Sequence, residues 1–526
     1  MNLNERLPTD RRTFDGARMT TVLWLAGLGF AGTCITLFLL HRLGLPMVYS
    51  MGITFTFLLA TTLVLSWITR TMTSSRFFFA GHQATAPVLG LGGQSDWACG
   101  AFLILFFSVS LTEKVILAPA LMLGILLQAV LIASAFQRSR VLTLPGFFAW
   151  RGQTQMPGHI TLLVSVAILL AISLAEFEIA HSILSALSGL KIDHAAIVVI
   201  LVAILPSIFG GWHALLLINA AFVTILIICL MGPAILVGFL PDLLQTARGL
   251  EGVETGLANL NLAPFSIFST SDELHSAGLI ILTMFVFAAG FAALPHSISR
   301  LSLNNRPISS VESLGWTALI IFLSFSALPL SIGLIINPPS SVSLAELLQT
   351  HPVFAMLPYF AVLLAAINGL AVTVFSASAA IVRALRRFRN LNPGEQSIFS
   401  TRLVIVLIAL AILFSPAENR PSASTLFIAA LLISAAGLFI PLVTNIWIAQ
   451  IPQWSIALAV IGGTACVALG LFGRTTVPQF ELVTWSAMGM GVAMAILLIG
   501  RLTNRRTALH QSDARLNEIR NPQWNR

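Results

Sequence analysis

The sequence predicts an all-α polytopic membrane protein with about 14 transmembrane helices. Its 526 residues are 57% hydrophobic and only 9% charged, and the mean hydropathy is +0.92. A soluble domain carries about 25% charged residues, so this chain cannot cover a globule with solvated side chains. The apolar residues form continuous runs of helix length, whereas a β-barrel would alternate and need more than 2 Tyr for its aromatic girdle. These observations exclude a soluble enzyme and a secreted disulfide scaffold.

Runs of about 20 apolar residues are long enough to cross a hydrocarbon core of ~30 Å as α-helices. We predict the spans 19–41, 46–69, 86–110, 115–136, 159–188, 194–210, 213–240, 276–296, 311–336, 352–383, 402–416, 423–449, 454–473 and 482–500. The runs 194–210 and 402–416 are the shortest. Between 352 and 383 the helix would measure ~45 Å at 1.5 Å per residue, so it must tilt, break or protrude from the membrane.

Basic residues give the orientation. With the N-terminus inside, only Arg42, Lys114, Lys191, Arg248, Arg420 and Arg474 lie outside, which leaves 22 of the 28 Lys and Arg residues inside. This split follows the positive-inside rule and accounts for the net charge of +8 without a nucleic-acid partner. We therefore expect a multi-pass protein of the cell inner membrane with both termini cytoplasmic.

Motifs for catalysis or for resident cofactors are missing from the sequence. It has no ATP-binding fingerprint, catalytic triad or zinc-ligand spacing, and its 4 Cys residues are not paired in spacing. We expect no enzymatic activity and no cofactor beyond Na⁺ or H⁺ as a coupling ion. The sequence carries no signal for an oligomeric state.

The span 86–110 contains a carboxylate directly after a glycine-rich stretch. Three of the four residues 90–93 are Gly, and Asp96 follows. A charge at the bilayer centre costs at least ~2.5 kcal/mol, and transporters break helices where such polarity is needed. This pattern predicts unwinding near Gly92–Gln94. The alternative is that the glycines only allow close helix packing and Asp96 is hydrogen-bonded to a neighbour.

Further polar residues interrupt the spans 159–188 and 352–383. Glu178 and His181 are three apart and share a helical face, whereas Glu176 lies about 160° from Glu178. These groups could relay protons or hold a cation, or one face could meet water near the outer end of the span. Asn368 could be an oxygen ligand or a hydrogen-bonding contact between helices.

Four stretches resemble motifs of a known family. They are residues 76–82 (RFFFAGH) running on to Asp96-Trp97, which resemble "YYVAGR" and a later "DWMSAASF"; residues 143–148 (TLPGFF), which resemble "TIPDFL"; residues 209–212 (FGGW), which resemble "FGGM"; and residues 295–300 (PHSISR), which resemble "PHILMR". On these residues the chain resembles the sodium:solute symporter family over roughly residues 45–450. The resemblance is to its acetate-permease-like branch of monocarboxylate transporters.

The resemblance implies a LeuT-type five-plus-five inverted repeat. The segments would be 1–18 (cytoplasmic), 19–85 (two peripheral helices), 86–240 (first repeat), 241–275 (extracytoplasmic loop), 276–449 (second repeat), 450–500 (two peripheral helices) and 501–526 (basic cytoplasmic tail). Helices 86–110 and 276–296 would both be discontinuous, with the solute bound between them.

The resemblance also implies a sodium site. Its carbonyl ligands fall at Gln94, Trp97 and Ala365, and its two side-chain ligands fall at Asn368 and Gly369. Many family members have Ser-Thr at the last two positions, so this chain departs from the common ligand set.

Three polar residues are expected to act in solute binding or coupling: Asp96, Glu176 and Asn219. Glu176 stands where the family has Gln, and Asn219 aligns with a position that is often polar. Glu178 and His181 are weaker candidates. The expected sodium site lacks the two hydroxyl ligands at Asn368 and Gly369, and Glu176 adds a carboxylate. Protons are therefore an alternative to sodium as the coupling ion.

The expected function is secondary active transport, in which entry of a small organic anion (a monocarboxylate such as acetate) is coupled to a sodium or proton gradient by alternating access. The alternative is a sensor or scaffold of transporter-like fold that carries no solute and docks a partner on its basic tail. A copy that folds without either activity is a third possibility.

Overall fold

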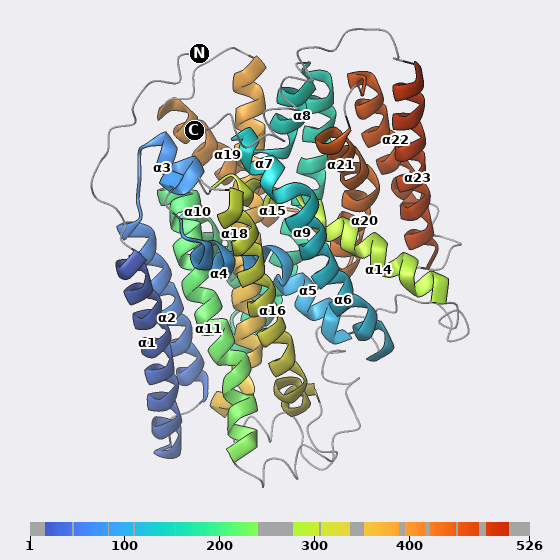
Figure 1. Ribbon diagram of the computed structural model, residues 1–526. Coiled ribbons are helices and arrows are strands. Elements are labelled where there is room, and N and C mark those ends of the chain that lie inside the picture. The colour runs from blue at the N-terminus through green and yellow to red at the C-terminus, as the bar shows by residue number, and fades with distance from the viewer. Residues whose placement is uncertain are drawn as a thin grey trace.

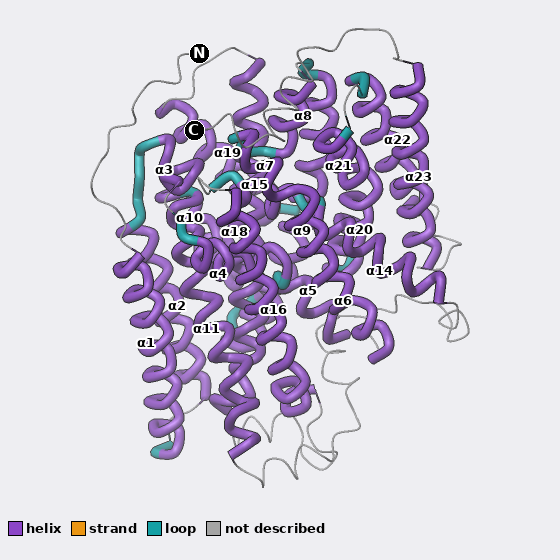
Figure 2. Tube along the Cα trace, in the orientation of Figure 1, coloured by secondary structure: helices purple, strands orange, loops and turns teal. Residues whose placement is uncertain are grey.

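The computed structural model of the protein describes residues 16–44, 47–82, 84–108, 111–152, 154–239, 277–303, 307–336, 352–388, 395–415, 421–448, 451–472 and 480–503. Within these ranges every regular element is a helix and there is no strand (Figure 2). Lipid offers no hydrogen-bond partners, so an apolar chain satisfies its backbone internally by forming helices. The predicted all-α class is therefore confirmed.

The helices are, in chain order, α1 (Gly16–Arg42), α2 (Met47–Ile68), α3 (Ser74–Phe79), η1 (Ala80–His82), α4 (Ala86–Trp97), α5 (Gly100–Ser108), α6 (Leu111–Leu127), η2 (Gln128–Ala133), α7 (Ser134–Ser139), α8 (Leu144–Gly152), α9 (Met156–Ser188), α10 (Ile192–Gly210), α11 (Trp212–Phe239), α14 (Ala277–Ala292), α15 (Pro295–Leu301), α16 (Pro307–Ile336), α18 (Pro352–Phe388), α19 (Glu395–Leu413), α20 (Ala423–Ile433), η4 (Ser434–Phe439), α21 (Ile440–Trp447), α22 (Gln453–Phe472) and α23 (Phe480–Thr503). Of these, η1 is a 3₁₀ turn, whereas η2 and η4 are π-helical turns.

Membrane-spanning capacity is distributed along the whole described chain. In this part, 9 helices are long and apolar enough to cross a membrane, and 2 bent helix pairs bring the number to 11. Three shorter apolar helices, Gly52–Ile68, Ile308–Ser324 and Ser397–Leu413, fall on the predicted spans 46–69, 311–336 and 402–416. The protein is therefore a multi-pass membrane protein, and the count of fourteen spans stays a prediction.

Two bent pairs begin the two predicted five-helix halves. In the first pair, α4 and α5 meet at 58°; in the second, α14 and α15 meet at 53°. The pairs enter the bundle from opposite ends, and their breaks approach each other in its interior (Figure 1). The flanking helices α1 and α2 lie at one side of the bundle, and α22 and α23 lie at the other (Figure 1). Both predicted discontinuous helices are thus bent.

The first break lies later in the sequence than the glycines predict. Helix α4 is continuous to Trp97, and the chain leaves helical geometry at Ala98, with φ −107° and ψ 58°. The glycines serve packing instead: a Cβ added at Gly90 would lie 2.8 Å from the Ser313 carbonyl oxygen. The prediction of unwinding near Gly92–Gln94 is therefore wrong, and the alternative that the glycines allow close helix packing is correct for this stretch.

Helix α18 forms the centre of the bundle. It is one continuous helix of 37 residues with Pro358 near its start. Of the three alternatives for its length, a break is therefore excluded, and tilt and protrusion remain. Its membrane-length segment Leu357–Leu385 is buried by its neighbours throughout its most apolar window. Because α18 packs on α9, α11 and α5, it contacts the elements that carry the first break. The predicted loop 241–275, most of segment 1–18 and most of the tail 501–526 lie outside the described residues.

Candidate functional site

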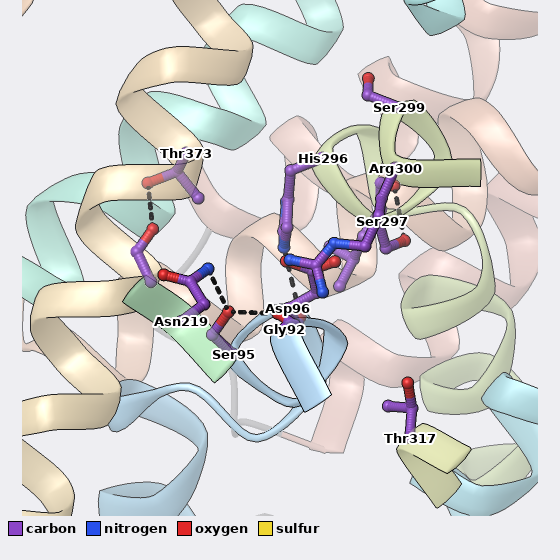
Figure 3. A network of polar contacts seen from close by, with 12 residues as sticks. Gly92, Ser95, Asp96, Asn219, His296, Ser297, Ser299, Arg300, Thr317 and Thr373 are labelled. Atoms are coloured by element: carbon purple, nitrogen blue, oxygen red, sulfur yellow. Dashed lines mark hydrogen bonds and ion pairs between the residues drawn. The ribbon is translucent and has the colours of Figure 1, made fainter. Parts of the chain in front are cut away.

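A buried ion pair connects α4, in the first bent helix pair, to α15, in the second. Asp96 lies in the last turn of α4, and its Oδ1 is 2.6 Å from Nη2 of Arg300 on α15. The two side chains point toward each other across the interior (Figure 3), and they are 1% and 7% exposed. Thr317 of α16 adds a second link by donating its hydroxyl to the Gly90 carbonyl oxygen at 3.0 Å. Helix α4 is therefore held against α15 at its last turn and against α16 at Gly90.

Side chains from neighbouring helices satisfy the backbone that the breaks leave unpaired. Gln128, the first residue of the π-helical turn η2, donates Nε2 to the Ala292 carbonyl oxygen at 3.2 Å and to Ser297 Oγ at 2.9 Å. His296 places Nε2 3.2 Å from the Asp96 carbonyl oxygen (Figure 3). Buried backbone groups need such partners in a membrane. The breaks are therefore supported by tertiary contacts rather than being frayed helix ends.

A small cavity lies beside the ion pair. It is bordered by Gly93, Asp96, Arg300, Ser313 and Thr317, among others, and its volume of about 10 Å³ suits one water molecule. Arg300 borders this cavity, and its Nε and Nη1 have no hydrogen-bond partner in the part of the chain that the structure describes. The cavity therefore adjoins a buried cation with unused donors.

Glu176 lies on the side of the first break, between α4 and α5, that is opposite to the cavity beside Arg300. This residue of α9 is 0% exposed, and its Oε1 accepts the Ala101 backbone N–H of α5 at 3.0 Å. A Cβ added at Gly369 of α18 would lie 3.0 Å from Glu176 Cδ, and one at Gly100 would lie 2.8 Å from Oε2. The carboxylate is thus wedged between the start of α5 and α18. That is where the resemblance expects sodium.

The second oxygen of Glu176 is unsatisfied. Oε2 accepts no N–H or O–H among the described residues, and the thiol of Cys99, a weak donor, lies beside the carboxyl group. No ion pair to a basic side chain of the described chain compensates this carboxylate. Because an unpaired buried charge is expensive, the carboxyl group is stable here when it is protonated or binds a cation.

The amide side chains at the first break also leave oxygen atoms free. Gln94 donates Nε2 to the Ala98 carbonyl oxygen at 3.2 Å, and Asn219 of α11 donates Nδ2 to Ser95 Oγ at 3.1 Å (Figure 3). The Oε1 of Gln94 and the Oδ1 of Asn219 have no hydrogen-bond partner within the described ranges. Each unsatisfied buried group costs about 1–3 kcal/mol, so these acceptors indicate a place for water, a proton donor or a hard cation.

The remaining predicted ligands lie at the same junction. Asn368 is buried in α18 with its Nδ2 unpartnered, and Ala365 is fully buried on the same helix. The tightest contact between the break and α18 belongs to neighbours of these residues, because a Cβ at Gly100 would lie 2.5 Å from Ala366 Cβ. Trp97 stacks on Phe291 of α14, with ring centroids 6.2 Å apart.

Two weaker candidates do not join the site. Glu178 is half-buried and lies on the face of α9 away from Glu176. His181 places Nδ1 2.8 Å from the Phe177 carbonyl oxygen of its own helix and packs its ring 4.8 Å from that of Phe177. Neither residue contributes a group to the break.

Sequence reasoning did not identify Arg300, Gln128 or Thr317 as site residues. Arg300 was assigned to an inside loop in the topology count, whereas it is buried in the bent pair and meets Asp96. The sequence held one signal: Arg300 lies only five residues after Pro295, directly behind the apolar run 276–296. His296 is also buried, and it contacts the end of α4.

Comparisons with solved structures identify the fold. A Na⁺-coupled sialic acid symporter, solved in a substrate-bound outward-open state, is similar with a TM-score of 0.65 and 14% sequence identity, covering 88% of this chain and 98% of that chain. This is the fold of a membrane transporter. The Eremococcus coleocola manganese transporter, solved with an aromatic bis-isothiourea substituted compound, has a TM-score of 0.45 and 15% identity over 83% of this chain and 95% of that chain. Both neighbours are membrane transporters and not enzymes. No family profile matches the sequence, and no curated protein matches it.

Proposed function

We propose that the protein is a secondary active transporter that couples entry of a small organic anion, a monocarboxylate such as acetate, to a sodium or proton gradient by alternating access. The observation that carries this proposal is Glu176. It is a fully buried carboxylate at the junction of a broken helix and α18. Among the described residues it has no basic partner, and the weak thiol donor of Cys99 lies beside it. We also propose that the protein lies in the cell inner membrane with both termini in the cytoplasm.

The chemistry of Glu176 requires an exchangeable positive charge. Leaving an ion buried without a partner costs several kcal/mol, so the carboxylate must bind a cation or a proton in this conformation. Oxygen ligands suit a hard cation such as Na⁺, and the unpartnered Oε1 of Gln94 is available nearby on α4. The resemblance places Gln94, Trp97, Ala365, Asn368 and Gly369 around the same ion. Sodium and a proton therefore compete for the same role.

The position of Glu176 explains how the charge would drive transport. Its Oε1 accepts a hydrogen bond from the first turn of α5, a half-helix whose N-terminus favours negative charge. Binding of a cation or proton changes that interaction, and so it changes the relative stability of the conformations in which α5 sits differently on α18. The fold it shares with a Na⁺-coupled symporter supports this arrangement. Half-helix ends near the midplane are the usual place for solute and ions in such folds.

Uptake into proteoliposomes tests the proposal. Purified protein is reconstituted, and accumulation of labelled acetate, propionate and pyruvate is measured under an inward sodium gradient and, separately, under an inward proton gradient. We expect at least one gradient to drive accumulation. Glu176→Gln should lower gradient-driven accumulation by about tenfold or more, within the usual 5–150-fold range of coupling effects.

Glu178→Gln is the matched control, because it removes a carboxylate from the same helix but from the face away from the break. It should transport like the wild type. Equal gradient-driven accumulation in Glu176→Gln and the wild type would remove Glu176 from coupling and defeat the proposal.

A sensor or scaffold is the second candidate, and the tight packing at the break favours it. Glu176 fills the space between Gly100 and Gly369, and the cavity beside Arg300 suits only about one water molecule. If the protein is a sensor or scaffold, acetate, propionate or pyruvate would raise the melting temperature of the purified protein without any flux in liposomes. Flux under either gradient excludes this candidate.

A further inference from the structure

Arg300 has more hydrogen-bond donors than its ion pair with Asp96 uses. A guanidinium carries five N–H donors, and the ion pair with Asp96 engages only Nη2 at 2.6 Å. The side chain is 7% exposed and lies over the Trp212 ring, with Cζ 5.7 Å from the ring centroid, but Nε and Nη1 have no hydrogen-bond partner among the described residues. Buried polar groups in proteins nearly always have a partner, so these unused donors indicate that Arg300 binds something else during its working cycle.

The unused donors border the cavity between α4, α15 and α16. A Cβ added at Gly93 would lie 2.9 Å from Arg300 Nη1 and 2.6 Å from Thr317 Oγ1, so this space exists only because residue 93 is glycine. The cavity suits about one water molecule and is too small for a carboxylate. A carboxylate can reach Arg300 here only when α4 and α15 separate.

Separation of these helices breaks the Asp96–Arg300 pair. Removing one partner of a buried ion pair is strongly unfavourable because it leaves the other charge uncompensated. A carboxylate on the solute offers Arg300 the same oxygen geometry as Asp96, and guanidinium binds such groups well. An empty transporter has no replacement, so its α4 and α15 stay together.

We propose that Arg300 is the anion-binding residue of the transport cycle, and that it exchanges Asp96 for the carboxylate of the solute as α4 and α15 separate. This inference rests on the proposed transport function and deepens it by assigning recognition of the negative charge to one side chain. It separates two roles at the two sides of the first break: Glu176 takes the cation or proton, and Arg300 takes the anion. It also explains why the coupling ion would not cross alone.

Transport of acetate and of its neutral isostere acetamide tests the exchange. Full-length wild type, Arg300→Lys, Arg300→Gln and Asp96→Asn are reconstituted under the gradient that drives the wild type. Arg300→Gln should raise the KM for acetate by about tenfold or more, which is the effect of losing a charged hydrogen bond. Acetamide uptake should stay unchanged, and Arg300→Lys should restore part of the acetate affinity.

Asp96→Asn leaves Arg300 without its resident anion. We expect a lower KM for acetate and an increased leak of the coupling ion in the absence of solute, because α4 is no longer held by charge. Arg402→Gln is the control for loss of an arginine, since Arg402 donates to backbone oxygens, including that of Ile208 at 2.7 Å. It should not change the ratio of acetate to acetamide uptake, whatever its effect on the melting temperature.

The outcomes separate this inference from the proposed function. If the wild type accumulates acetate and Arg300→Gln has the same KM, or loses acetate and acetamide equally, Arg300 is a structural residue and the inference fails while transport stands. If the wild type accumulates none of the acids under either gradient, the proposed function fails and the inference fails with it. Should Arg300→Gln not fold, the KM of Arg300→Lys and the ion leak of Asp96→Asn decide the matter.

Discussion

At the scale of single residues, two glycines make room for Glu176. Gly100→Ala is expected to lower the melting temperature of the detergent-purified protein and to weaken gradient-driven uptake. The added methyl group would lie 2.5 Å from Ala366 Cβ and 2.8 Å from Glu176 Oε2, so it must displace both. Overpacking of this kind costs about 1–3 kcal/mol.

The matched control is Gly315→Ala in α16, where nothing lies within 4 Å of an added Cβ. Alanine favours a helix over glycine, so this change should be neutral or slightly stabilising. If Gly100→Ala melts and transports like Gly315→Ala, the carboxylate is not wedged at the break as described.

Residue types in the sequence predicted part of the site and missed the rest for a physical reason. Asp96 and Glu176 stood out because ionisable groups are rare and expensive in apolar spans, whereas Gln94 was predicted only through the family resemblance. Arg300 did not, because an arginine near the end of an apolar run is usually a topology signal. Only the contact with Asp96 at 2.6 Å distinguishes a site arginine from an arginine that marks topology. That contact links residues 204 positions apart.

At the scale of elements, the lengths of apolar runs predicted helices and their approximate limits, whereas the location of the break did not follow from local composition. The glycines before Asp96 suggested unwinding there, but α4 continues to Trp97. The break after Trp97 is held by hydrogen bonds from distant helices, such as that from the Ala101 N–H to Glu176. Such contacts are not encoded in helix propensity.

Movement of the first bent pair should be visible at Cys99, which lies in the break. In this structure the residue is 3% exposed. A variant that keeps only this cysteine is treated with a membrane-permeant maleimide, with and without the coupling ion and acetate. We expect the labelling rate to change by about fivefold or more, because ligands that shift a conformational equilibrium typically do so by 1–3 kcal/mol.

A variant that keeps only Cys229 provides the comparison, since this residue is fully buried in the unbroken helix α11. Its labelling should not respond to ion or solute. A response of equal size at both cysteines would mean general loosening of the bundle rather than motion at the break.

At the scale of the whole molecule, the distribution of basic residues predicts which face of the bundle is cytoplasmic. Helix α9 offers a direct test because exposed residues stand just beyond both of its ends: Thr154 before Met156 and Lys191 after Ser188. Each is changed to Cys in a background without other cysteines, and intact cells are treated with an impermeant maleimide. We expect Lys191→Cys to be labelled in intact cells and Thr154→Cys only after lysis, because the positive-inside rule puts the Arg138, Arg140 and Arg151 end inside. Labelling with the opposite sidedness would invert the whole bundle.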